Sequence, residues 1–197
     1  MPMNIPSAKH LKKRAVSVVM AVLVILSPLV AMASQKAVLE NIILTNTRDD
    51  LVVYFDVKNA FTPEMEEAVL NGIPTSFSFV AAIYRSRTAW FDKKLSALEV
   101  TSTLKYNSLK QEFSVHRPWK TEPLSVVTSF EEAKALMIEI DNLLVTPLST
   151  LTKGEKYQIR IKAELSKVTL PLYLHYVLFF LSLWDFETAW HTVEFIY

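Results

Sequence analysis

The sequence of 197 residues contains no cysteine and only two glycines, Gly72 and Gly154. Without cysteine the protein forms no disulfide, no thiolate metal site and no thiol nucleophile, and it cannot carry a lipoprotein cysteine. Two isolated glycines form neither a phosphate-binding loop nor a dinucleotide-binding fingerprint, because both need clustered glycines. The Gly-x-Ser-x-Gly elbow of hydrolases is absent as well. The sequence therefore lacks several signatures of enzymes and of cofactor-binding proteins.

A strong excess of one charge is also lacking. The chain has 21 Lys and Arg against 20 Asp and Glu, which gives a formal net charge of +1. A nearly balanced chain has no long-range attraction for a phosphate backbone, so we expect no nucleic-acid partner. The length fits one domain, or one domain plus a targeting segment.

Residues 1–33 contain the three regions of a secretory signal peptide in the correct order. Four Lys and Arg residues precede the apolar stretch 15–30, which is interrupted only by two serines and Pro28. Ala31-Met32-Ala33 then supplies the small-x-small pattern of a signal peptidase site, which predicts cleavage after Ala33. The alternative is an uncleaved anchor in the inner membrane, but the 16 residues of this stretch fall short of the about 20 that a span needs.

Cleavage would leave a single β-rich domain, residues 34–197, with 17 basic and 20 acidic residues and a net charge of −3. An exported domain of this size without cysteine indicates the bacterial periplasm. In this interpretation the protein touches a membrane only through an uncleaved leader. The sequence does not indicate an oligomeric state.

Strand patterns dominate the rest of the chain. Apolar and polar residues alternate in 51–57 and in 76–83, a period of two that places one face of each segment on a core. Further runs of this kind are 38–45, 95–106, 111–117 and 156–165. Their short, turn-rich separators predict antiparallel neighbours. We therefore expect a mainly β (α+β) fold, a twisted antiparallel sheet or sandwich with two short packed helices.

Two segments have helix signals instead. Thr62 is followed by Pro63 and by glutamates in the first turns, and Gly72 ends the segment. In the second segment Thr128 and Glu131 have the spacing of a capping box, and Phe130, Ala133, Met137 and Ile140 are expected on one helix face. The polar and proline-rich stretch 117–129 before this helix is expected to be a loop.

A long uncharged run near the C-terminus, Thr169 to Trp184, resembles a membrane span. It is short for a span and contains Pro171 and His175. The segment after it has no Lys or Arg, which contradicts the positive-inside bias if the leader stays cytoplasmic. We therefore predict a buried segment in two parts, a helix over 172–181 and a strand over 184–195, with a membrane span as the alternative.

Four phrases of the sequence carry a resemblance to a known family. They are YRSRTAWFDKKL from Tyr84, LKYNSLKQEFSV from Leu104, LSTLTKGEKYQIRIKAEL from Leu148 and LPLYLHYVLFFLSLWDFETAW from Leu170. In this order they resemble the bacterial domain-of-unknown-function family 4390, from about residue 36 to residue 195. The resemblance implies an exported domain with a leader, found in gene neighbourhoods with a membrane sensor kinase of the nitrogen-regulation type. Such a neighbourhood would imply an inner-membrane or periplasmic protein partner.

Residues that could perform chemistry are few. The histidines of the predicted domain, His116, His175 and His191, are widely spaced and show no metal-binding spacing. Asp185 and Glu187 would point to one face of a strand, where flanking aromatic residues could raise a carboxyl pKa. An ordinary strand with one polar face has the same pattern. We therefore predict no catalytic residue, no metal and no cofactor, and a protein that is not an enzyme.

A basic patch is the other candidate site. Arg85 and Arg87 are expected on one face of a strand, with Lys93 and Lys94 in the following turn. Together with Lys105 and Lys110 on the next hairpin, these residues could make a patch that binds an anionic headgroup or an acidic partner. Solvated charges that protect a sheet edge have the same pattern. The predicted binding surface comprises Arg85, Arg87, Trp90, Trp184, Asp185 and Trp190.

Three functional hypotheses follow. The first is a non-enzymatic interaction or accessory module of the cell envelope that binds a protein partner, linked to a membrane sensor kinase. The second is a periplasmic module that binds a small ligand or lipid in an apolar pocket. Its expected lining is Phe77, Phe79, Trp90, Trp184 and Trp190. The third, a hydrolase, needs carboxylates or histidines that folding brings together.

Overall fold

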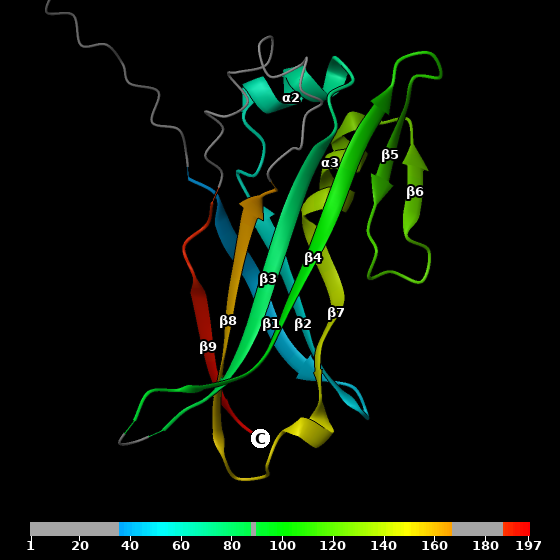
Figure 1. Ribbon diagram of the computed structural model, residues 1–197. Coiled ribbons are helices and arrows are strands. Elements are labelled where there is room, and N and C mark those ends of the chain that lie inside the picture. Colours follow the sequence, from blue (N-terminus) through cyan, green and yellow to red (C-terminus); the bar gives the residue numbers. More distant parts are fainter. Residues whose placement is uncertain (1–35, 88–89, 167–186) are drawn as a thin grey trace, which may run out of the picture. The chain divides into compact units, whose positions relative to one another are not determined.

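Paired strands make up most of the chain that the structure describes. A computed structural model describes residues 36–87, 90–166 and 187–197 (Figure 1). The predicted leader with its cleavage site at Ala33 and the predicted helix over 172–181 lie outside these residues. The described residues all fall within one compact unit, Gln35–Tyr197.

The described strands form two sheets in which all neighbours are antiparallel. The smaller sheet has the order β1-β2-β7, with β1 at Val38–Asn46, β2 at Asp50–Lys58 and β7 at Glu139–Pro147. The larger sheet has the order β6-β5-β4-β3-β8-β9, with β3 at Thr75–Arg85, β4 at Lys93–Asn107, β5 at Glu112–His116, β6 at Leu124–Val127, β8 at Lys156–Leu165 and β9 at His191–Ile196. The predicted mainly β fold with antiparallel sheets and two helices is confirmed.

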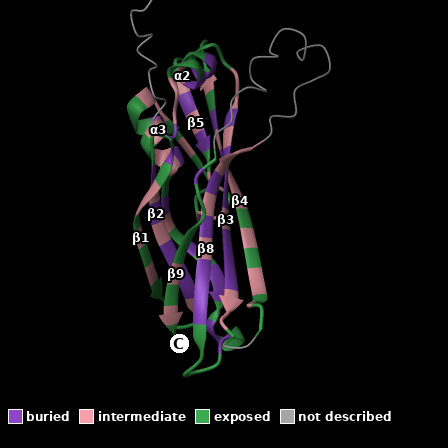
Figure 2. Cartoon of the chain, turned by 90° about the vertical axis from the view of Figure 1, so that its left-hand side faces the viewer, coloured by how far each residue is buried: buried purple, intermediate pink, exposed green. Residues whose placement is uncertain are grey.

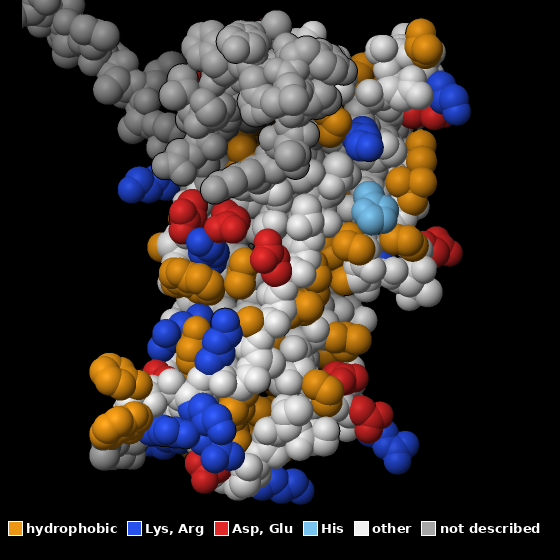
Figure 3. All heavy atoms as spheres, viewed as in Figure 1, with side chains coloured by type: hydrophobic (Ala, Val, Ile, Leu, Met, Phe, Trp, Pro, Cys, Tyr) orange, Lys and Arg blue, Asp and Glu red, His pale blue; other side chains and the backbone are white. Residues whose placement is uncertain are grey.

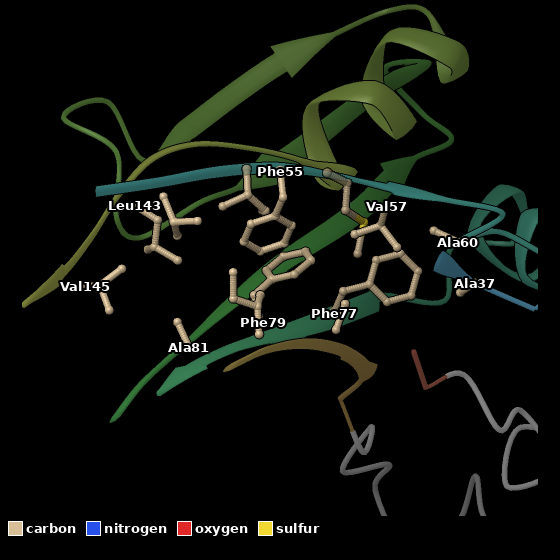
Figure 4. Packing of buried hydrophobic residues seen from close by; sticks show 14 of the residues in the cluster. Ala37, Phe55, Val57, Ala60, Phe77, Phe79, Ala81, Leu143 and Val145 are labelled. Atoms are coloured by element: carbon tan, nitrogen blue, oxygen red, sulfur yellow. The ribbon is translucent and has the colours of Figure 1, made fainter. Parts of the chain in front are cut away.

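The two sheets enclose one apolar core. Phe55 of β2 and Phe79 of β3 meet edge to face across it, with ring centroids 5.9 Å apart (Figure 4). The alternation predicted for 51–57 and 76–83 places these side chains there, since the intervening residues point to the opposite face. Figure 2 shows the consequence, with buried residues concentrated along β2, β3 and β8 and exposed residues along β9.

Helix α2, Pro63–Leu70, begins as the sequence predicts. The Thr62 side chain accepts a hydrogen bond from the backbone N–H of Met65 (3.3 Å), and Pro63 occupies the first turn. The apolar stripe of the helix, which includes Met65 and Val69, is buried. Gly72 follows the helix with a φ of +83°, a left-handed conformation that glycine adopts without strain.

Helix α3, Phe130–Ile138, differs from the prediction at both ends. Ser129, rather than Thr128, is the N-cap, and its hydroxyl accepts from the backbone N–H of Glu132 (3.4 Å). Ile140 does not belong to the helix, because the chain becomes extended at Glu139 and pairs with β2. Its side chain is nevertheless buried, because β7 directs it to the core as the predicted helix face would have done.

Two strands were not expected. Strand β6 lies within the stretch predicted to be a loop and pairs with β5. Strand β7 does not show a strict alternation of apolar and polar residues, because its pairing with β2 is irregular and Asn142 has a φ of +53°. Because the irregularity adds one residue to the strand, the next buried position after Ile140 is Leu143 and not Asn142.

The predicted C-terminal strand is shorter than expected. Strand β9 begins at His191, and Glu187 forms only an isolated bridge with Glu164. The uncharged run 169–184 lies outside the described residues, so the choice between a span and a buried segment stays a prediction. Among the helices of the described chain, none has the length and apolar character that crossing a membrane requires.

Candidate functional site

The outer face of β8 carries a row of charged side chains. Core residues from Tyr157 to Ala163 alternate along this strand with Gln158, Arg160, Lys162 and Glu164, of which Gln158 is also buried. The first set faces the core, so the second set lies on the opposite side of the larger sheet. Figure 3 shows this side, where basic and acidic side chains lie next to each other over β8 with hydrophobic side chains among them.

Lys162 organises the upper part of the row. Its Nζ lies 2.6 Å from a carboxylate oxygen of Glu164 and 2.8 Å from one of Glu187. Hydrogen bonds with these two carboxylates raise the pKa of the Lys162 ammonium above its ordinary value. The same Nζ lies 5.3 Å from the ring centroid of Trp190, a cation–π contact. Trp190 is thereby held against the sheet while 51% of its surface remains exposed.

Arg160 organises the lower part. Its Nη2 donates to Asp92 Oδ2 (3.0 Å) and to Gln158 Oε1 (3.2 Å). Gln158 donates to the same Asp92 oxygen. The guanidinium lies over the ring of Tyr84, 4.3 Å from its centroid. Arginine, aromatic ring and carboxylate therefore hold one another in a fixed arrangement.

Together these groups form what we name the β8 face, made up of Tyr84, Asp92, Arg160, Lys162, Glu164, Glu187 and Trp190. Its basic groups are already neutralised by carboxylates, and its aromatic rings are ordered by the cations beside them. Trp, Tyr and Arg are the residue types that contribute most of the energy of protein interfaces. Chemically, the β8 face is suited to binding a surface of matching shape and charge.

The structure separates the predicted site residues. Arg85 is the last residue of β3, and its guanidinium lies at the end of the core, with Nη2 2.8 Å from Thr152 Oγ1 and Cζ 5.9 Å from the ring centroid of Tyr157. Arg87 lies beyond the strand and is exposed, so the two arginines do not share a strand face as predicted. The cause is that β3 ends at Arg85, after which the alternation of sides no longer applies.

The predicted aromatic residues also lie in different places. Trp90 is 75% exposed in the connection between β3 and β4, whereas Trp190 lies on the β8 face. Phe77 and Phe79 are fully buried in the core, so the expected pocket lining is not brought together. Trp184 and Asp185 lie outside the described residues.

The histidines do not converge either. His116 lies on β5 and His191 on β9, and β4, β3 and β8 separate these strands in the sheet. His175 lies outside the described residues. Within 36–87, 90–166 and 187–197, no group of three or more His, Cys, Asp or Glu is placed to hold a metal ion.

Sequence reasoning missed most of the β8 face. Arg160, Lys162 and Glu164 recur at every second position of a segment correctly predicted as a strand. This alternation was the available signal, because it places three charges on one face. The contacts with Asp92 and Glu187 had no such signal, since those residues lie 68 and 25 positions away in the chain.

The fold and this face define a two-sheet β domain with a charged and aromatic outer surface. Its sequence matches the profile of the family described as Domain of unknown function (DUF4390) over residues 34–194, and the chain therefore belongs to this family. The family membership predicted from the four sequence phrases is confirmed. No curated protein and no solved structure matches the chain.

Proposed function

We propose that this protein is a non-enzymatic interaction module of the bacterial cell envelope that binds a protein partner through the β8 face. One observation carries the proposal, namely that Trp190 is half exposed and held on Lys162, whose ammonium is fixed by two carboxylates. A partner that covers Trp190 gains apolar burial from a side chain that is already ordered. Such preorganisation lowers the entropic cost of association.

The electrostatics of the β8 face support a protein partner. Burying a charge is costly unless that charge is paired. Arg160 and Lys162 each have carboxylate partners within the chain, so a partner surface can cover them without leaving an isolated charge. The exposed side of Trp190 and the ring of Tyr84 then supply the contacts that bury apolar surface.

The place of action in this proposal is the periplasm, after removal of the leader. The proposal is supported by the three-region leader before residue 34 and by the absence of cysteine. The partner class is an inner-membrane protein, and the family resemblance points to a membrane sensor kinase of the nitrogen-regulation type. The domain would then act as an accessory subunit outside the membrane.

Site-specific photo-crosslinking in intact cells tests the proposal. A photoreactive aromatic amino acid, which keeps a ring at the position, replaces Trp190 in one strain and Leu109 in a second. Leu109 is a matched control because it is 96% exposed in the turn between β4 and β5, away from the β8 face. We expect one envelope protein to be captured repeatedly from position 190 and not from position 109.

The captured protein is then purified and its affinity measured directly. For a hot-spot tryptophan, Trp190→Ala is expected to weaken binding by about 2 kcal/mol or more, roughly thirtyfold. Leu109→Ala should leave the affinity unchanged. Equal capture from both positions, or an unchanged affinity for the Trp190→Ala variant, would refute a role for the β8 face.

A further inference from the structure

Two neighbouring aromatic side chains, Trp90 and Phe91, are the most exposed aromatic residues that the structure describes. Trp90 is 75% exposed and Phe91 is 88% exposed. Side chains of this size bury about 150–250 Å² each when they are covered. Most of the surface of both side chains is exposed, so a considerable apolar area faces water. We name this pair the aromatic tip.

Exposed basic residues surround the aromatic tip. Arg87 precedes it, and Lys93 and Lys94 follow it. Lys153 lies in the turn before β8, and Lys156 is the first residue of β8. None of these five forms an ion pair with any residue in the described ranges. We name these five residues the basic ring.

Backbone hydrogen bonds place both groups at one end of the larger sheet. The N–H of Ser86 donates to the carbonyl of Lys156 (3.0 Å), which joins the start of the β3–β4 connection to β8. The turn before β8 is joined in turn to the C-terminal residue Tyr197 through the N–H of Gly154. Figure 3 shows hydrophobic side chains beside a group of basic ones at the lower left, where Figure 1 places the connection between β3 and β4.

The acidic groups at this end of the sheet do not neutralise the positive charge of the basic ring. Asp92, next to the aromatic tip, is directed back to Arg160 of the β8 face (3.0 Å) and to Gln158. This contact both neutralises Asp92 and fixes the chain where it leaves the aromatic tip. The other acidic side chains near this end are Glu155 of the adjoining turn and Glu194 of β9, which is paired with Gln158. The remaining charge around the aromatic tip is therefore positive.

We propose that the aromatic tip and the basic ring form a contact site for a bilayer that contains anionic phospholipid. Trp and Phe partition to the boundary between headgroups and acyl chains, while Lys and Arg extend their charged ends to the phosphates. The arrangement here has the same order, with the aromatic pair at the projecting connection and the cations behind and beside it. This contact goes beyond the proposed function, uses a different surface and does not require the leader.

The shape of the site favours a bilayer over a folded partner. A protein hot spot is usually surrounded by other contacts that exclude water, whereas Trp90 and Phe91 project with charges on either side. A fluid surface accepts such a projection without a matching pocket. Each cation near an anionic bilayer adds about fivefold in affinity, and salt weakens the effect.

Vesicle co-sedimentation of the full chain, as processed and purified from cells, tests the site. The probes are vesicles of phosphatidylcholine alone and vesicles with equal parts phosphatidylcholine and phosphatidylglycerol. We expect binding to the anionic vesicles that decreases with added salt. Trp90→Ser/Phe91→Ser should weaken this binding about tenfold or more, and Lys93→Gln/Lys94→Gln should weaken it to a similar degree at low salt.

Two control variants show whether a loss of binding is specific to the aromatic tip. Leu109→Ser removes an equally exposed apolar side chain from the opposite end of β4 and should leave binding unchanged. Trp90→Phe keeps an aromatic ring and should retain most of the binding. Every variant is expressed with the same leader, so a difference between variants reports on the aromatic tip even if some molecules retain the leader.

The outcomes separate a bilayer from an acidic protein surface. Polyglutamate is added as a soluble acidic competitor. If it binds as tightly as anionic vesicles do, and Trp90→Ser/Phe91→Ser has no effect on vesicle binding, the site recognises acidic chains and the bilayer proposal is wrong. Equal binding to neutral and anionic vesicles would likewise overturn it. Loss of crosslinks from position 190 would leave this proposal unaffected, because that test concerns the β8 face.

Discussion

The two ends of the larger sheet use the same residue types in opposite ways. At the end with the helices, Lys134 of α3 lies 2.6 Å from Glu66 of α2 and 2.8 Å from Glu131, and its ammonium lies over the ring of Phe130. That ring in turn stacks on Phe113 of β5. At the other end, lysines and aromatic rings lie next to each other with no such partners among the described residues.

The difference indicates what each end contributes. A lysine that connects two helices and covers an aromatic ring contributes to the stability of the fold. A lysine beside an exposed tryptophan does not stabilise the fold and faces the surroundings. The helical end is therefore expected to respond to mutation through stability, and the end with the aromatic tip through binding.

The largest expected effect comes from the core between the two ends. Phe79 is fully buried and contacts Phe55 and Trp119 edge to face. Phe79→Ala removes these contacts and leaves a cavity, so the free energy of unfolding should fall by about 3–5 kcal/mol in urea denaturation. The matched control is Phe91→Ala, the same change at an exposed ring, for which we expect a shift within about 0.5 kcal/mol. Similar losses in both variants would contradict the assignment of Phe91 to the surface.

A smaller effect is expected at the helical end. The side chain of Lys134 is 15% exposed, and Lys134→Ala leaves the carboxylate of Glu66 without its partner. We expect the free energy of unfolding to decrease by about 1–2 kcal/mol. Lys94→Ala removes an exposed lysine that forms no ion pair with the described residues, and as the control it should change the free energy of unfolding by less than about 0.5 kcal/mol.

The pH dependence of this difference gives a second measurement. Burial alone would lower the pKa of the Lys134 ammonium, but hydrogen bonds with Glu131 and Glu66 outweigh burial and raise it. A raised folded-state pKa stabilises the fold below the unfolded pKa of about 10.4, and this contribution is lost as pH rises through the folded pKa. The difference in the free energy of unfolding between wild type and Lys134→Ala should therefore become smaller above about pH 10.4. If this difference in the free energy of unfolding stays constant up to about pH 11.5, roughly one unit above that unfolded pKa, Lys134 stabilises the fold through packing and not through its charge.

The sequence was sufficient for the elements whose signals are local. The alternation around Phe55 and Phe79 predicts strands whose apolar sides form the core, and Thr62 with Pro63 predicts the start of α2. Both signals depend on neighbours a few positions apart. Strand β7 had no local signal, because an irregularity at Asn142 interrupts its period of two.

The candidate site required contacts between distant parts of the chain. Trp190 was predicted to be a binding residue, and the structure shows why it is held in place, since Lys162 lies under its ring. No local pattern predicts that Asp92 reaches Arg160 across 68 positions. Arg85 was expected to act with Arg87, but the position of the strand end separates them. Strand ends and cross-strand partners are properties of the folded sheet.

The smallest expected effect has the opposite sign and concerns the basic ring. Lys93 is directly opposite Arg85 in the pairing of β3 with β4, and like charges in this position are destabilising. Lys93→Gln/Lys94→Gln should therefore raise the free energy of unfolding at low salt, by about 0.2–0.5 kcal/mol. The gain should disappear at about 1 M salt, where the screening length falls to about 3 Å.

The sign of this change in the free energy of unfolding tests the contrast between the two ends of the sheet. A gain in stability on removing the lysines, together with weaker vesicle binding, means that the basic ring costs the fold some stability and acts in contact with an external surface. A loss of stability comparable to that of Lys134→Ala would mean that Lys93 and Lys94 have structural partners in the folded chain. In that case the contrast between the ends fails, and the positive charge beside the aromatic tip no longer argues for an anionic bilayer.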